Sequence, residues 1–295
     1  MKEQELKDYN RAGQIAKEVT AYAKELIKRD MLLLDIAKKI DDKIYELGGQ
    51  PAFPVNLSIN EIAAHYHPVL GDETKAEGLL KVDIGVHING FIADTAFSMD
   101  LTDNKRYKGL IEASEQAVEN AIKLLDKNPA LNEIGEEIQN TIEEKGFSPV
   151  VNLSGHSLKK YDLHAGITIP NYEDGNHRKL EEGAYAIEPF ATTGEGRIYE
   201  GEQSNIYSVV KPKTPRSPMA RKILDYAWEK YQGLPFSLRE IQEKFGVMAR
   251  ISLKQLEQAG IVHNFPQLIE KSHNPVSQAE HTVVIWKEGI KVTTK

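Results

Sequence analysis

The spacing of apolar residues divides the chain into alternating helical and strand-rich stretches. In residues 3–47 apolar side chains recur at helical spacing, which predicts two amphipathic helices, and the Gly48-Gly49 pair should end the second. Residues 51–99 change to short β-prone runs, 105–125 and 131–145 are helical in pattern, and 150–207 are again strand-rich. We therefore predict an α+β fold whose two halves share one element order, as an internal duplication would leave.

The segment 211–273 differs in composition from its surroundings. Three prolines within residues 211–218 favour a connector over a helix or a central strand. Residues 219–272 have the pattern of short helices with a glycine-bearing turn, which resembles a winged-helix unit, and strand-like sequence resumes at 279–294. We predict one main domain, 1–210 and 274–295, interrupted by a helical insertion at 211–273.

Residues 82–94 carry the first candidate chemistry. Asn89-Gly90 between two β-prone runs predicts a two-residue hairpin, because both loop positions of that turn need positive φ. In this register Gly85 pairs with Asp94, so Asp83 and Asp94 share a face as diagonal neighbours beside a residue without a side chain. Two carboxylates directed at one space repel each other unless protons or cations intervene. A divalent-metal site and a pair of solvated acids are both compatible with this pattern.

Three later segments favour the metal site. His156 follows a Ser-Gly corner at the end of a β-rich run, although a lone histidine there is more often only hydrogen-bonded. The pattern places Glu188 inside an apolar strand and Glu280 at the start of the last β segment, where an unpaired charge would be costly. Four carboxylates and one imidazole are a donor set suited to two divalent cations, whose charge the carboxylates would balance.

Composition narrows the class of protein. The 295 residues carry 37 basic and 44 acidic side chains, a net charge of −7, which argues against a general nucleic-acid binder. With 40% hydrophobic and 27% charged residues the chain should be globular. It has no cysteine, which excludes disulfides, thiolate metal sites and cysteine nucleophiles. The charged N-terminus and short aliphatic runs predict no signal peptide or membrane span, and hence a cytoplasmic protein.

The order of these residues, with their local sequence, resembles the type II methionine aminopeptidases, metallopeptidases of the pita-bread fold. The resemblance covers essentially the whole chain, and the insertion also matches type II. It implies a pita-bread fold with pseudo-twofold halves. It is carried by the segments PAFPVNLSINEIAAHY, VHINGFIADTA, NLSGH, LHAG, IEPFAT and EHT.

The resemblance implies a role for each matching residue. Asp83 would chelate one metal, Asp94 and Glu280 would bridge both, and His156 and Glu188 would complete the other. His65 and His164, which spacing alone would leave as structural, would flank the substrate. The pocket for methionine would be formed by Phe53, Leu163 and Phe190, which are otherwise plain core residues. His67 stands where relatives more often have a small polar residue, and we expect it to alter the pocket entrance or to contact a metal.

The implied function is removal of the N-terminal methionine from nascent proteins and peptides, with preference for a small second residue. Two divalent ions per chain (Co, Mn, Fe, Zn or Ni) would activate water, Glu188 would handle its proton, and His164 would stabilise the oxyanion. We expect a monomer with no membrane or specific nucleic-acid partner, and the ribosome as a further candidate partner.

Two alternatives remain. One is an Xaa-Pro dipeptidase-like activity, although those enzymes usually carry an extra N-terminal domain. The other is a catalytically silent homologue that binds the ribosome or nucleic acid through the insertion. The charges of residues 219–271, eight Lys/Arg against six Asp/Glu, are too even for a phosphate-binding face.

Overall fold

A computed structural model of the chain describes residues 1–211 and 213–295. Pro212, one of the three prolines of the predicted connector, lies outside the described residues. The helices are α1 (Glu3–Leu26), α2 (Leu33–Glu46), α3 (Lys108–Leu124) with the 3₁₀ turn η1 (Leu125–Lys127), α4 (Leu131–Glu144), α5 (Pro218–Tyr231), α6 (Leu238–Phe245) and α7 (Met248–Gln258).

Most strands are short and belong to antiparallel pairs. In chain order they are β1 (Gln50–Pro51), β2 (Asn56–Ile59), β3 (Ile62–Ala64), β4 (Leu79–Ile88), β5 (Phe91–Asp100), β6 (Ser148–Pro149), β7 (Ser154–Leu158), β8 (Thr168–Pro170), β9 (Gly183–Ile187), β10 (Phe190–Thr192), β11 (Ile198–Val209), β12 (Phe236–Ser237), β13 (Val262–Glu270), β14 (Val276–Gln278), β15 (His281–Trp286) and β16 (Gly289–Val292).

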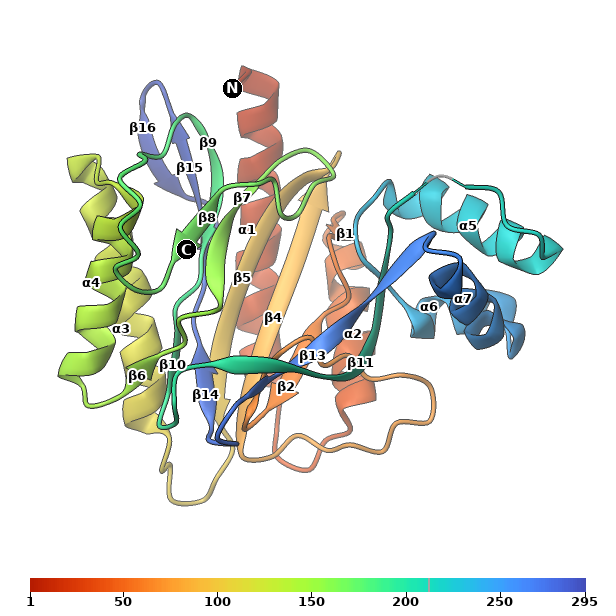
Figure 1. The fold of residues 1–295 in the computed structure, drawn as a ribbon, viewed down its shortest axis with the longest axis horizontal. Helices are drawn as coiled ribbons and strands as arrows, with labels where there is room; N and C mark the ends of the chain where they lie inside the picture. Colours follow the sequence, from red (N-terminus) through yellow and green to blue (C-terminus); the bar gives the residue numbers. More distant parts are fainter. Residues whose placement is uncertain (212) are drawn as a thin grey trace.

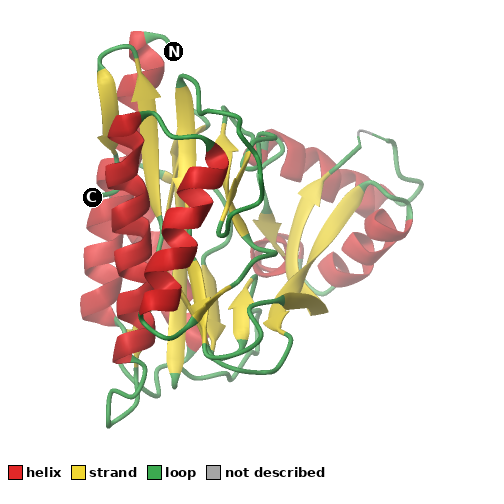
Figure 2. Cartoon of the chain, turned by 60° about the vertical axis from the view of Figure 1, so that its left-hand side comes forward, coloured by secondary structure: helices red, strands yellow, loops and turns green. Residues whose placement is uncertain are grey.

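The predicted order of helices, strands, helices and strands is confirmed. In the first half, β4 pairs with β1, β2 and β5, and α1 packs on β4 and β5. In the second half, β9 lies between β7 and β15, and α3 and α4 form the helical layer. Figure 1 shows α1 and α2 behind the first set of strands and α3 and α4 beside the second. Figure 2 shows the main-domain helices gathered on the outer side of the strands.

The β4–β5 hairpin has the predicted register. Asn89 and Gly90 adopt φ angles of 53° and 87°, and Gly85 lies opposite Asp94. Val82, Ile84 and Val86 on one face of β4 belong to a buried apolar cluster with Ile15 of α1 and Ile36 of α2. Because side chains alternate along a strand, Asp83 and Gly85 face the other way, toward the second half.

Three helices and a long strand pair form the part of the molecule between β10 and β14. Along the chain, α5, α6 and α7 come between β11 and β13. The two strands pair with each other, and β13 also pairs with β3 (Figure 1). The sequence around Val262, grouped with the helices in the sequence analysis, forms strand β13 instead. The boundaries of the insertion at 211–273 remain a proposal.

The insertion and the main domain share one apolar core and one buried ion pair. Phe53 and Ile92 of the main domain belong to the same buried cluster as Ile223 and Leu253 of the insertion helices. Arg239 of α6 forms an ion pair with Asp41 of α2. Among the described residues, no helix combines the length and the apolar character needed to cross a membrane.

Candidate metal centre

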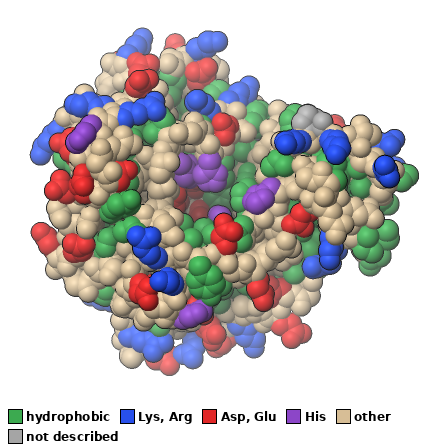
Figure 3. All heavy atoms as spheres, in the orientation of Figure 1, with side chains coloured by type: hydrophobic (Ala, Val, Ile, Leu, Met, Phe, Trp, Pro, Cys, Tyr) green, Lys and Arg blue, Asp and Glu red, His purple; other side chains and the backbone are tan. Residues whose placement is uncertain are grey.

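The five predicted ligands come from separate strands and meet in one cavity. Asp83 lies on β4, Asp94 on β5 and His156 on β7, while Glu188 follows β9 and Glu280 precedes β15. Pairing of Ala96 with Glu280 brings the last segment against β5, and pairing of His156 with Ala186 places it beside the strand that leads to Glu188. All five line a cavity of about 360 Å³. Figure 3 shows this face hollowed at its centre, with histidine side chains at the hollow.

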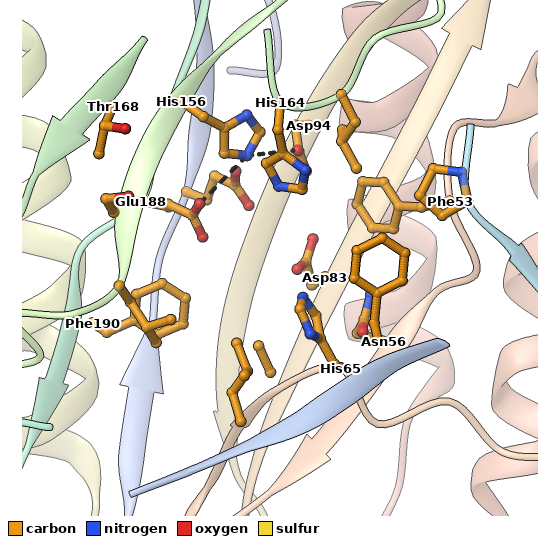
Figure 4. Close-up of a pocket in the computed structure, with 18 of the residues that line it drawn as sticks. Phe53, Asn56, His65, Asp83, Asp94, His156, His164, Thr168, Glu188 and Phe190 are labelled. Carbon is orange, nitrogen blue, oxygen red and sulfur yellow. Dashed lines mark ion pairs between the residues drawn. The ribbon is translucent and has the colours of Figure 1, made fainter. Parts of the chain in front are cut away.

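The ligand atoms lie close enough to share cations. Asp94, His156 and Glu280 each offer one atom within 4.8 Å of the others. His156 Nε2 lies 3.7 Å from Asp94 Oδ2 and 3.5 Å from Glu188 Oε1 (Figure 4). Asp83 is linked to Glu188 through the side chain of Gln278, whose Nε2 lies 3.4 Å from Asp83 Oδ2 and 3.5 Å from Glu188 Oε2.

Burial makes this concentration of charge costly without cations. The pKa of Asp83 is raised to about 7 by burial. The pKa values of Asp94, Glu188 and Glu280 lie well above the usual range, first because of burial and then because of the neighbouring carboxylates. Burial, with a smaller contribution from His164, lowers the pKa of His156 to about 3, so its imidazole is neutral. A neutral imidazole is the form that binds a metal.

The donor set fits divalent cations. Buried oxygens of Asp83 (Oδ1), Asp94 (Oδ1) and Glu280 (Oε1 and Oε2) have no hydrogen-bond partner among the described residues. Such oxygens are rare in folded proteins unless a donor, a water or an ion satisfies them. Oxygen-rich sites with one imidazole suit Mn²⁺, Fe²⁺, Co²⁺ or Zn²⁺. The cluster is therefore a candidate site for divalent metal.

Two further histidines line the same cavity. His65, at φ 67°, directs Nδ1 toward the carbonyl oxygen of Pro266 at 3.0 Å. The ring of His164 lies 4.4 Å from that of His156, centre to centre. In Figure 4 His65 and His164 lie on opposite sides of Asp83. Burial lowers the pKa of both, that of His65 to about 4, so both are neutral at pH 7.

An apolar wall completes the cavity. Phe53, Leu163 and Phe190, the three residues expected to contact methionine, all line it. A Cβ atom on Gly85 would lie 2.3 Å from the ring of Phe53, so glycine is required opposite Asp94 for this ring to fit. The sequence patterns did not indicate the lining residues that the β11–β13 pair and its surroundings contribute, among them Ile206, Phe265 and Leu268.

The expectation for His67 is wrong. Its ring is buried, with 3% of its surface exposed, and Nδ1 lies 2.8 Å from the carbonyl oxygen of Val55. His67 is not among the described residues that line the cavity. His65 adopts a left-handed φ of 67°, and the second histidine of the pair is buried.

Comparisons with known proteins agree with the fold and identify the family. The model of metallopeptidase family M24 matches residues 7–214. A methionine aminopeptidase of Thermococcus onnurineus is 45% identical over 292 residues, covering 96% of this chain and 97% of its own. The solved structure of a thermophilic Arx1 has a TM-score of 0.86 at 18% identity, covering 99% of this chain and 91% of its own. That of a methionine aminopeptidase from Thermotoga maritima has a TM-score of 0.70 at 20% identity, covering 100% and 98%. The predicted pita-bread fold is confirmed.

Proposed function

This chain belongs to metallopeptidase family M24, among the methionine aminopeptidases, and from this premise we propose that it removes the N-terminal methionine of peptides by two-metal hydrolysis. The observation that supports the metal-dependent part best is the set of buried, unpartnered carboxylate oxygens around His156. We assign the protein to type II, acting on nascent chains in the cytoplasm as a monomer, with the ribosome as a candidate partner.

Each ligand has a proposed place in the centre. Asp83 would hold one ion, His156 and Glu188 would hold the other, and Asp94 and Glu280 would bridge them. Such cations, when bound, supply Lewis acidity that makes water a nucleophile near neutral pH. The identity of the ions depends on availability as much as on affinity, with Co, Mn, Fe, Zn and Ni as candidates.

The side chains around the ligands would carry the remaining steps. Glu188 takes the proton of the attacking water and passes it to the leaving amine. His164, neutral and at the cavity wall, donates a hydrogen bond to the oxygen of the scissile carbonyl as negative charge develops there.

His65 has a defined protonation pattern. Its Nδ1 faces a carbonyl oxygen, which only accepts, so in the neutral ring Nδ1 carries the hydrogen and Nε2 is the acceptor. We propose that Nε2 accepts a hydrogen bond from an N–H of the substrate backbone near the scissile amide. The side chain of methionine would lie against Phe53, Leu163 and Phe190, and a small second residue would be preferred.

A substrate and metal matrix tests this function. The metal-free protein is titrated with Mn²⁺, Co²⁺, Fe²⁺, Zn²⁺ and Ni²⁺ and assayed on Met-Ala-Ser, on Ala-Pro and on a peptide that begins with proline. We expect metal-dependent release of methionine from Met-Ala-Ser alone. Cleavage of Ala-Pro would favour the dipeptidase alternative. If no peptide is cleaved with any of the metals, the non-catalytic alternative is favoured.

A further inference from the structure

Gln278, a residue outside the predicted ligand set, lies beneath the metal centre. It is the last residue of β14, two positions before Glu280, and it is 1% exposed. Burying a side-chain amide costs free energy unless its hydrogen bonds are made, so a purely structural position would favour an apolar residue. The contacts of the amide therefore indicate why glutamine stands here.

The amide of Gln278 contacts one ligand from each half of the molecule. Its Nε2 lies 3.4 Å from Asp83 Oδ2 and 3.5 Å from Glu188 Oε2. Ionised carboxylates only accept hydrogen bonds, so the nitrogen and not the oxygen of the amide must face them. The two hydrogens of one NH₂ group suffice for both carboxylates.

The backbone of Gln278 is fixed so that its side chain has little freedom. The hydroxyl of Ser98 on β5 accepts from the backbone N–H of Gln278 at 2.9 Å and donates to its carbonyl oxygen at 2.8 Å. On the other side Gln278 pairs with Phe190 of β10, two residues after Glu188. Gln278 is thus held between β5, which carries Asp94, and β10, which begins two residues after Glu188.

We infer that Gln278 is a positioning residue of the metal centre. Its amide ties Asp83, a ligand of one ion, to Glu188, a ligand of the other, and holds both carboxylates in place before the ions bind. The inference rests on the proposed two-metal function. Gln278 is not among the described residues that line the cavity, so it acts through the ligands and not on the substrate. Because the amide contacts one ligand of each ion, its loss should weaken the binding of both ions, whereas a contact to one ligand alone would weaken the binding of one ion.

The neighbouring residue supplies a matched control. Ser277 is equally buried and lies on the same strand, but its side chain faces the opposite way and donates to the carbonyl oxygen of Leu110 on α3 at 2.8 Å. Ser277→Ala therefore removes one buried hydrogen bond from β14 without touching a ligand. Gln278→Met keeps the length of the side chain and removes its donor.

Calorimetric titration of the metal-free proteins with Mn²⁺ alone is the test, with the visible spectrum of Co²⁺ as a second readout. For Gln278→Met we expect the Kd of both ions to rise roughly 10–100-fold, the usual effect of losing a group that orients a ligand. The Co²⁺ spectrum should change, and excess Mn²⁺ should restore kcat. Ser277→Ala should lower the Tm of the metal-free protein without changing either Kd.

Three outcomes would overturn the inference. The first is a Gln278→Met variant with the same Kd values as the parent, and the second is a rise in the Kd of one ion only. The third is a Ser277→Ala variant that binds Mn²⁺ as weakly as Gln278→Met does. If Gln278→Met does not fold, Ser98→Ala releases the backbone of Gln278 and should raise both Kd values, and parental values there refute the inference. A parent chain that binds no Mn²⁺ would refute the proposed function as well, whereas the other outcomes leave that function intact.

Discussion

Replacing Glu280 with glutamine should stabilise the metal-free protein while it removes activity. Glu280 is 1% exposed, and neither of its carboxylate oxygens has a partner among the described residues. Burial and the charges of Asp94, Glu188 and Asp83 raise its pKa well above the usual range. A neutral amide at this position removes one buried charge and introduces a donor for the remaining carboxylates.

The size of the effect follows from the spacing of the charges. One ligand atom of Glu280 and one of Asp94 lie within 4.8 Å of each other. Two unit charges about 4 Å apart repel by about 4 kcal/mol at an effective dielectric constant of about 20. Partial protonation relieves some of this repulsion. In a chain of this length a change of 1 kcal/mol in stability shifts the Tm by about 2 °C, so we expect the Tm of metal-free Glu280→Gln to rise by about 4–8 °C.

The gain in stability should depend on pH with a definite sign. The folded state holds a proton on this cluster above pH 4.5, where an unfolded glutamate has lost it, so the stability of the metal-free parent falls as pH rises through that window. Glu280→Gln lacks one of these groups. Its advantage over the parent should therefore be larger at pH 8 than at pH 5.5.

Differential scanning calorimetry on metal-free protein at both pH values is the assay, with Glu270→Gln as the control. Glu270 is also buried, but it accepts hydrogen bonds from Ser272 and Asn274, and these lower its pKa. Its replacement should lower the Tm, the opposite sign. A Tm of Glu280→Gln below that of the parent, or retention of most of the activity on Met-Ala-Ser, would refute the reasoning.

Three further predictions concern groups at and around the site. His164→Ala should lower kcat by roughly 10²–10³ and leave metal binding unchanged, because the ring donates to the oxyanion and holds no metal; loss of metal in calorimetry would show that its role is misassigned. Burial lowers the pKa of His67 to about 3, so the parent loses stability as pH falls below 6.5. The destabilisation caused by His67→Gln should therefore shrink by about 1.4 kcal/mol per pH unit below pH 6.5, measured by urea unfolding, and a constant difference would contradict the burial of a neutral ring. Arg239→Met should cost about 3–5 kcal/mol by leaving Asp41 buried and unpaired, and Arg239→Met with Asp41→Leu should recover most of this loss; parental stability of Arg239→Met alone in urea unfolding would contradict this.

Local sequence patterns were sufficient for much of the fold and for placing Asp83 and Asp94 on one face. Asn89-Gly90 determines the hairpin register and thereby places Asp83 and Asp94 on one face. Glycine at position 85 indicated open space there, and the structure shows that the space is filled by the ring of Phe53. These inferences depend on one turn type and on the alternation of strand side chains, which are local properties.

Other features depend on pairings between distant segments. Ile206 and Leu268 line the cavity because β11 pairs with β13 and β13 with β3, a register with irregularities that no local pattern encodes. Gln278 offered one signal, a polar residue in step with Glu280 on a strand-like run, but its contacts to two ligands follow from the tertiary arrangement. His67 was misplaced because the left-handed backbone conformation at His65 cannot be deduced from a His-Tyr-His pattern.

The proposed function requires a pair of cations held by Asp83, Asp94, His156, Glu188 and Glu280. Crystals of the protein grown with Mn²⁺ and measured at the manganese absorption edge test it most directly. We expect two anomalous peaks about 3.5–4 Å apart, enclosed by these five side chains. A single peak, or manganese bound elsewhere with the five side chains turned away from one another, would contradict it.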